Sequence, residues 1–281
     1  LADGSHTYVA TATDNAGNEA SASYTWTVDT VDPTVSITDG HADGSSTTST
    51  TADFTVTATD ADPSSGITTA CTLDTVAQDD CDGDFTSLAD GSHTFSATTT
   101  DAAGNSASAS VTWTVDTTAP SASIDSQPAD NNNDNDDATF TFSGDDGAGT
   151  GVASFECSFD GGDYAACTSP HDVGNDLADG THTFDVRAID AAGNTGSAAS
   201  YSWTVDDTAP SAAITSDVVW DTDGTVTVTF TASDATSGIA SCTLTISDGQ
   251  THDCASGDGT ADFTVADGSD YTANILSLIH I

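Results

Sequence analysis

Apolar and small polar residues alternate with a period of two along much of this chain. In segment 106–115 every second residue is apolar and those between are Ser or Thr; the apolar set is Ala107, Ala109, Val111, Trp113 and Val115. Such a strand buries one face and exposes the other, which is typical of an antiparallel sheet. Similar alternation recurs through the chain without a helical period. We therefore expect an all-β protein.

Turn residues between the alternating segments predict hairpins. The sequence DAAGN at 101–105 supplies Asp, Gly and Asn between two such segments. Upstream, a loop at 161–163 is expected to place Cys157 directly opposite Cys167. With the other alternating segments this gives about seven short strands per unit. The pattern predicts two packed antiparallel sheets, an immunoglobulin-like β-sandwich.

One block of sequence occurs three times and begins a fourth. It opens with LADGSH at Leu1 and Leu88, LADGTH at Leu177 and VADGSD at Val265, a period of about 88 residues. A fixed period of this size indicates tandem copies of a small domain, arranged like beads on a string. The expected division is the end of repeat 1 at 1–31, repeat 2 at 32–118, repeat 3 at 119–208 and a truncated repeat 4 at 209–275.

Both ends of the chain suggest a longer protein. Residue 1 already lies inside a repeat, so we expect this to be a fragment. The last six residues, LSLIHI at 276–281, are rich in Leu and Ile, unlike the rest of the chain, and resemble a translated sequencing adapter. We expect this tail to be non-native and to lie outside the repeat.

The chain carries 45 acidic residues against a single Arg or Lys, Arg187, for a net charge of −44. All but two of the acids are Asp; the exceptions are Glu19 and Glu156. Repulsion excludes nucleic acid and anionic lipid as partners, and no segment is predicted to insert into a membrane. A single basic side chain cannot balance this negative charge. We therefore expect cations from the solution to balance it.

Six cysteines form three pairs, one in each of repeats 2, 3 and 4. The predicted disulfides are Cys71–Cys81, Cys157–Cys167 and Cys242–Cys254. Spacings of 10 to 12 residues do not resemble the C-x-x-C pattern of metal or redox sites. Pairing within each repeat indicates an oxidising, extracellular setting; buried free thiols are the alternative.

At 155–210 the sequence reads F-x-C-S-x-D-G-G, then L-A-D-G-T-H-T-F, D-A-A-G-N and W-T-V-D-x-T-A-P. It resembles the bacterial Ig-like repeats that occur in tandem in large secreted and cell-surface proteins of adhesin or stalk type. The resemblance covers nearly all of residues 1–275, although repeats 2 and 4 lack the Gly-Gly turn between their cysteines. It implies a spacer, stalk or adhesive array outside the cell, in some cases attached to an enzyme.

A recurring set of Asp residues is the candidate metal site. In an Ig-like sandwich, the loop between the second and third strands and the last hairpin loop lie at the end that receives the preceding domain. Those loops and the linkers carry Asp29, Asp32, Asp60, Asp101, Asp116, Asp146, Asp190, Asp206, Asp207 and Asp234. Such irregular oxygen clusters suit Ca²⁺. Alternatively, the hairpin Asp only caps its own turn and the rest are solvated, or the acidity is an adaptation to high salt.

Two functional interpretations remain open. We favour an extracellular structural spacer, stiffened by Ca²⁺, whose partners are neighbouring repeats, with other surface proteins or glycans as further candidates. The alternative is a set of accessory or glycan- or protein-binding modules of a large secreted hydrolase. We expect no enzyme activity within these residues, since no nucleophile–base pair or paired acid stands outside the repeated turns.

Overall fold

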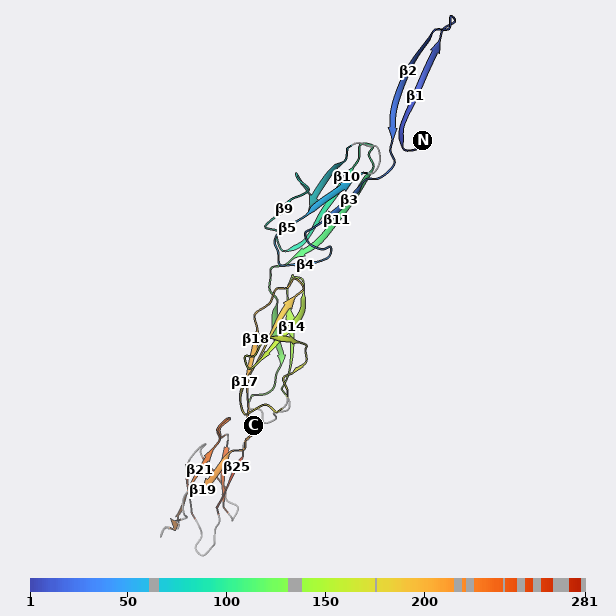
Figure 1. Cartoon of the computed structure of the whole chain (residues 1–281). Coiled ribbons are helices and arrows are strands. Elements are labelled where there is room, and N and C mark those ends of the chain that lie inside the picture. Colours follow the sequence, from blue (N-terminus) through green and yellow to red (C-terminus); the bar gives the residue numbers. More distant parts are fainter. Residues whose placement is uncertain are drawn as a thin grey trace. The chain divides into compact units, whose positions relative to one another are not determined.

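The computed structural model consists of β-strands joined by turns (Figure 1). It describes the backbone at residues 1–60, 66–130, 138–174, 176–214, 219–220, 225–239, 241–246, 251–254, 259–264 and 273–278. After residue 214, side chains are described only at 231–239, 241 and 243. Within these ranges no helix is long and apolar enough to cross a membrane.

The chain divides into two compact units. Unit 1 comprises Leu1–Pro120, Asp146–Ala153 and Ile189–Thr195; unit 2 comprises Ser121–Asp145, Ser154–Ala188 and Gly196–Ile281. Two turns of repeat 3 therefore belong to the same compact unit as repeat 2. The repeat boundaries inferred from the sequence remain predictions.

Unit 1 begins with a long hairpin of β1 (Gly4–Thr13) and β2 (Glu19–Val28). The two strands pair antiparallel over ten residues, from Gly4 opposite Val28 to Thr13 opposite Glu19. The turn between them is the first D-x-A-G-N sequence. Much of the hairpin is exposed, including Tyr8 and Tyr24.

Repeat 2 is a sandwich, as predicted. One sheet has the order β4 (Ser46–Thr47), β11 (Ser106–Val115), β10 (Gly91–Thr100), β7 (Thr68–Leu73) and β8 (Val76–Gln78). All of its neighbouring strands are antiparallel except β4 and β11, which are parallel. The pairs β3 (Thr34–Thr38) with β6 (Thr55–Thr59), and β5 (Ala52–Asp53) with β9 (Asp84–Phe85), complete the fold.

Alternation along the strands of repeat 2 produces the expected core. Trp113 is 1% exposed, and Phe54 and Phe95 are fully buried with their rings 4.8 Å apart. The Trp113 ring lies 5.1 Å from that of Phe54. The apolar positions of β10 and β11 thus face inward, while the intervening Ser and Thr hydroxyls pair across the outer face, as Thr98 and Ser108 do.

Repeat 3 has the same plan. One sheet has the order β15 (Ala165–Cys167), β14 (Val152–Phe159), β17 (Gly180–Asp190) and β18 (Ala199–Val205). A second has the order β12 (Ser121–Ser126), β13 (Thr139–Asp145) and β16 (His171–Asp172). Trp203, Phe140 and Phe184 form its core and are each at most 1% exposed.

The rest of unit 2 also consists of antiparallel strands. β21 (Thr225–Ser233) pairs with β19 (Ser211–Ile214), β20 (Val219–Trp220) and β24 (Gly259–Thr264). β22 (Ser241–Ile246) pairs with β23 (Thr251–Cys254) and β25 (Ala273–Leu278). Residues 276–278 of the expected non-native tail are thus part of β25. The backbone of these residues pairs with β22, and the non-native origin of the tail remains a prediction.

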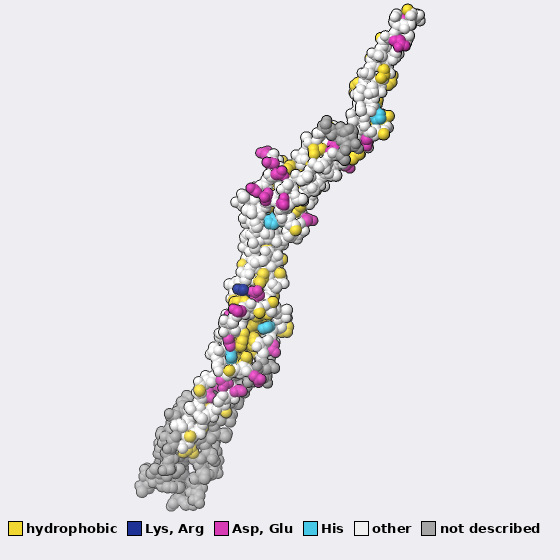
Figure 2. Space-filling view, viewed as in Figure 1, with side chains coloured by type: hydrophobic (Ala, Val, Ile, Leu, Met, Phe, Trp, Pro, Cys, Tyr) yellow, Lys and Arg dark blue, Asp and Glu magenta, His cyan; other side chains and the backbone are white. Residues whose placement is uncertain are grey.

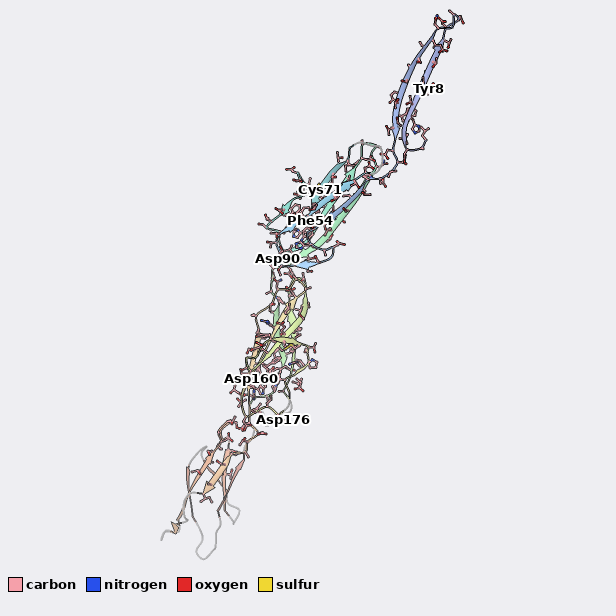
Figure 3. All side chains as sticks on the ribbon, in the orientation of Figure 1. Tyr8, Phe54, Cys71, Asp90, Asp160 and Asp176 are labelled. Carbon is pink, nitrogen blue, oxygen red and sulfur yellow. A yellow bond between two sulfur atoms is a disulfide. The ribbon has the colours of Figure 1, made fainter. Side chains whose placement is uncertain are left out.

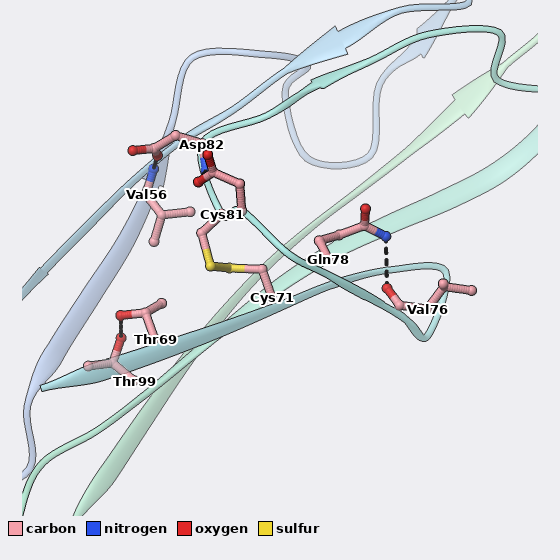
Figure 4. The surroundings of a disulfide bond; sticks show 9 residues. Val56, Thr69, Cys71, Val76, Gln78, Cys81, Asp82 and Thr99 are labelled. Carbon is pink, nitrogen blue, oxygen red and sulfur yellow. Dashed lines mark hydrogen bonds between the residues drawn. A yellow bond between two sulfur atoms is a disulfide. The ribbon is translucent and has the colours of Figure 1, made fainter.

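Two of the predicted disulfides are present. Cys71 is bonded to Cys81 (Figure 4) and Cys157 to Cys167, with Cα separations of 5.4 and 5.8 Å. The predicted register of the second hairpin is wrong, because Cys157 lies opposite Ala165 and Cys167 opposite Phe155. The turn is wider than a three-residue loop, with Asp160 and Gly161 both in the left-handed region. The disulfide is therefore diagonal across the pair.

The third predicted disulfide, Cys242–Cys254, has side chains outside the described residues. The backbone places these two positions directly opposite each other in the β22–β23 ladder.

In Figure 2, acidic side chains lie at many points of the visible face of the chain. The single guanidinium, Arg187, donates two hydrogen bonds to one oxygen of Glu156 and lies 4.0 Å from the centre of the Tyr164 ring. It therefore balances a carboxylate away from the Asp clusters described below.

Candidate metal centre

Three Asp side chains from separate segments meet within unit 1. Asp116 follows β11 in the linker, Asp146 follows β13, and Asp190 ends β17. Each offers a carboxylate oxygen, and these oxygens lie within 4.8 Å of one another. Asp116 and Asp190 are each 2% exposed and Asp146 is 9% exposed. The reading in which these residues are merely solvated is therefore wrong for this cluster.

The linker residue Asp116 is held by donors on both carboxylate oxygens. Its Oδ2 accepts hydrogen bonds from the amide and the hydroxyl of Thr150, at 2.7 and 2.8 Å. Its Oδ1 accepts one from the amide of Thr118 at 3.1 Å. Burial alone would raise the pKa of Asp116, but these donors outweigh burial and hold that pKa below its ordinary value. The ionised form of Asp116 is thus favoured even though its side chain is buried.

The hairpin residue Asp190 organises its own turn. Its Oδ1 accepts the amides of Gly193 and Asn194, and its Oδ2 accepts the Asn194 side-chain amide at 2.7 Å. The same amide nitrogen also donates to the backbone carbonyl of Asp116 at 2.8 Å. The sequence predicts only a turn position for this Asn. Its recurrence in every D-x-A-G-N turn was the available signal for a further role.

Asp146 supplies the oxygen that most needs a partner. Its Oδ2 accepts the amide of Gly151 at 2.7 Å. Its Oδ1 is buried and has no hydrogen-bond partner among the described residues. A buried carboxylate oxygen without a donor is costly, more so beside two other carboxylates.

The same arrangement recurs one repeat earlier. Asp29, Asp60 and Asp101 form a second triad within the same distance limit. The Asn105 amide donates to Oδ2 of Asp101 at 2.8 Å and to the carbonyl of Asp29 at 3.2 Å. Oδ2 of Asp29 is buried with no partner in the described part of the chain. Burial would raise the pKa of Asp101, but Asn105 and the turn amides lower it overall.

A third, partial cluster lies in unit 2. Asp206 is 3% exposed, and its Oδ2 accepts the amide of Ser237 at 2.9 Å. Oδ1 of Asp234 accepts three consecutive amides, those of Thr236, Ser237 and Gly238. Burial would raise the pKa of Asp234, but these amides and the Asp206 side chain lower it overall. The position expected for the hairpin Asp is occupied by Ser277 or Leu278.

Two predicted ligands are placed apart from these clusters. Asp32 is exposed and is not a member of the first triad. Asp207 is exposed, its amide donates to Oδ1 of Asp179, and it is not a member of either complete triad. Asp32 and Asp207 come after the linker Asp in sequence. Both are exposed, whereas the linker residues Asp29 and Asp206 are at least partly buried.

The donor set fits a hard divalent cation. Ca²⁺ takes six to eight oxygens at about 2.3–2.6 Å, so two of its ligand oxygens lie at most about 5 Å apart. The three carboxylates of each complete triad meet this limit. The unpartnered oxygens of Asp146 and Asp29 are in the same clusters, and each is a free ligand position. Asp116 and Asp190 would contribute the remaining charge.

The hairpin of repeat 1 shows what the turn does without a neighbouring linker Asp. Oδ1 of Asp14 accepts the amides of Ala16 and Asn18, and Oδ2 accepts the Asn18 side-chain amide at 2.8 Å. Asp14 is exposed, and the Asn18 side chain is the main cause of its lowered pKa. Capping is therefore intrinsic to the turn. Burial and the bond from Asn to the linker carbonyl are the additional features at Asp101 and Asp190.

No known protein-family model matches the chain, and no curated protein matches it. Among solved structures it is similar to fibronectin(III)-like modules of Clostridium thermocellum CbhA, with 16% identity, a TM-score of 0.37 and coverage of 61% of this chain and 94% of that chain. It is also similar to a tetra-tandem repeat from the extending region of a large adhesion protein, with 25% identity, a TM-score of 0.36 and coverage of 99% of this chain and 79% of that chain. A third similar structure is from a 1.5-MDa bacterial ice-binding adhesin, with 17% identity, a TM-score of 0.32 and coverage of 88% of this chain and 97% of that chain.

Proposed function

We propose that this chain is an extracellular structural spacer of Ig-like repeats whose junctions bind Ca²⁺ and are stiffened by it. The partners are the neighbouring repeats of the same chain. Disulfides persist in oxidising compartments, so the two described bridges favour an extracellular location. Extracellular Ca²⁺ modules work at Kd values of about 10⁻⁴–10⁻³ M, a range that irregular carboxylate clusters can reach.

One observation carries the proposal. The two complete triads each contain a buried carboxylate oxygen that has no donor, Oδ2 of Asp29 and Oδ1 of Asp146. Each triad draws its residues from a linker and from two turns of the next repeat. A bound cation would neutralise the three carboxylates and join the linker to both turns. Without one, mutual repulsion should loosen the same contacts.

Adaptation to high salt is the competing explanation. Monovalent salt screens exposed charges without regard to ion type. The measurement is the melting temperature and the scattering-derived maximum dimension of the full chain at matched ionic strength. The arms are chelator, millimolar Ca²⁺, and KCl alone. Binding should stabilise by RT ln(1 + [Ca²⁺]/Kd), about 2.7 kcal/mol at a hundredfold excess over Kd.

The Asp190→Ala variant tests the site itself. It should lose most of the Ca²⁺ response of its junction, and Asp14→Ala, which removes the same turn Asp without a neighbouring triad, should keep the full response. If Ca²⁺ changes neither quantity relative to KCl, and Asp190→Ala behaves like the unmodified chain, the clusters are not calcium sites.

A further inference from the structure

The L-A-D-G motif that opens the repeat at Leu1, Leu88 and Leu177 places an Asp next to each linker. Oδ1 of Asp90 accepts the amide and the hydroxyl of Thr117, at 3.0 and 2.9 Å. Its Oδ2 accepts the hydroxyl of Thr118 at 3.2 Å. Asp90 precedes β10 and the two Thr follow β11, so the contact closes the open end of this hairpin (Figure 3).

The contact recurs in the other two copies. Asp3 accepts the amide and the hydroxyl of Thr30, at 3.1 and 3.0 Å. Oδ1 of Asp179 accepts the amide of Asp207 at 2.9 Å, and its Oδ2 accepts the hydroxyl of Thr208. The linker Asp residues are Asp29, Asp116 and Asp206. In each case the bonded amide belongs to the residue directly after this Asp.

Three consecutive linker amides are held in this way. The amide of Asp116 donates to the carbonyl of Thr47 at 2.9 Å, that of Thr117 to Asp90, and that of Thr118 back to Asp116. The backbone on both sides of Asp116 is therefore fixed, and with it the direction of the carboxylate toward Thr150 and the triad. Asp90 itself is exposed and is not a member of a triad. Its contacts therefore act on the ligand and not on the ion.

We propose that Asp90 is a positioning residue for the cation site that contains Asp116, and that Asp3 and Asp179 act likewise on Asp29 and Asp206. This inference rests on the proposed Ca²⁺ function. It gives the L-A-D-G motif a role beyond the hairpin that it begins. The Asp of one repeat orients the linker Asp, and the turns of the next repeat supply the other ligands of the same site. Groups that orient metal ligands from outside the coordination shell typically change metal affinity about 10- to 100-fold when removed.

The test uses the full chain carrying two background substitutions. Asp101→Ala removes a ligand from the cluster of Asp29, and Asp234→Ala removes one from the cluster of Asp206, so that only the Asp116 site stays complete. Calorimetric titration with Ca²⁺ then reports the Asp116 site. Adding Asp90→Ala should weaken the Kd about 10-fold or more. Adding Asp3→Ala instead removes an equal charge from a different linker, and the Kd should not change.

Variants of Thr117 separate positioning from charge. Thr117→Val deletes a donor to Asp90 without changing the net charge and should also weaken binding, whereas Thr117→Ser keeps the hydroxyl and should preserve it. The loss in Asp90→Ala should persist at 1 M KCl, where a long-range charge effect is screened. Melting in chelator checks that each variant is folded.

The outcomes distinguish the two proposals. If the background chain binds no Ca²⁺, the proposed function fails. If it binds Ca²⁺ and Asp90→Ala binds equally well, only the positioning role is overturned. Equal weakening by Asp3→Ala and Asp90→Ala, or loss of the effect at high KCl, would also overturn it, because the effect would then be one of net charge.

Discussion

The side-chain amide of Asn194 donates to the backbone carbonyl of Asp116 at 2.8 Å, although the two residues are 78 positions apart. The same nitrogen donates to Oδ2 of Asp190 within its own turn. One amide group therefore joins the linker to the hairpin turn that would share a cation with it. Asn105 makes the corresponding bonds to Asp29 and Asp101.

We expect Asn194→Ala to weaken Ca²⁺ binding at its junction and to cost about 1 kcal/mol of stability, the usual net value of one hydrogen bond. Asn18→Ala is the matched control, because Asn18 caps the Asp14 turn without a described bond to a linker. The measurement is Ca²⁺ titration together with thermal melting in chelator. Equal effects of the two variants on Ca²⁺ affinity would show that Asn194 serves only its own turn.

The third cysteine pair should be a disulfide. Cys242 and Cys254 are directly opposite in the β22–β23 ladder, closer in register than the two bridged pairs. Peptide mapping without reductant should find Cys242 linked to Cys254. The double variant Cys242→Ser, Cys254→Ser, which leaves the other two bridges intact, should lower stability by about 2–3 kcal/mol on the chain-entropy estimate. Free thiols at these positions, or links between repeats, would contradict this.

The sequence was sufficient for the strands and the core, because alternation places Trp113 and Trp203 on the inner face whatever the loops do. Its ten candidate Asp residues include all six members of the two triads, since each recurs at a fixed place in the repeat, but they also include Asp32 and Asp207. It could not give the register of the Cys157 hairpin, which depends on the left-handed backbone at Asp160 and Gly161. It did not identify the donor Thr150, because a bond between segments leaves no mark on local spacing. For Asn194 the only signal was its recurrence in the turn, which does not name the linker carbonyl as its partner.

The recurring histidines should make stability pH-dependent. Nδ1 of His93 lies 2.7 Å from Oδ2 of Asp74, and Nε2 lies 2.8 Å from the carbonyl of Ala89. Both neighbours are acceptors, so only the protonated ring donates to both. Burial lowers the pKa of His93, but the Ala89 carbonyl and the Asp74 carboxylate outweigh burial and raise it overall. His182 has the same partners in Ala178 and Asp160, and its pKa is raised for the same reasons.

A raised folded-state pKa stabilises the protein fully below the unfolded value, about 6.5, and this stabilisation is lost as the pH rises through the folded value. Denaturant unfolding in chelator should therefore show stability falling as the pH increases above about 6.5. The double variant His93→Gln, His182→Gln should flatten that part of the profile. An unchanged slope in the double variant would assign the pH dependence to other groups.

Gly149 is a position where a small substitution should disturb the proposed cation site without replacing any of its ligands. A Cβ at this residue would lie 2.7 Å from Oδ2 of Asp116 and would also clash with Oδ2 of Asp146. The backbone of Gly149 is not in the left-handed region, so Ala is conformationally allowed there. The added methyl group must therefore push the two carboxylates away from their places in the triad.

We expect Gly149→Ala to weaken Ca²⁺ binding at this junction by about 10-fold or more, as for loss of a group that orients the ligands. Stability in chelator should change far less, because parting two carboxylates also relieves their repulsion. Gly83→Ala is the control, since its nearest neighbour, the carbonyl of Asp80, is 3.9 Å from the added Cβ. Titration in the background that isolates the Asp116 site measures both variants. Unchanged affinity in Gly149→Ala would mean that the ion, if bound, is not held between Asp116 and Asp146.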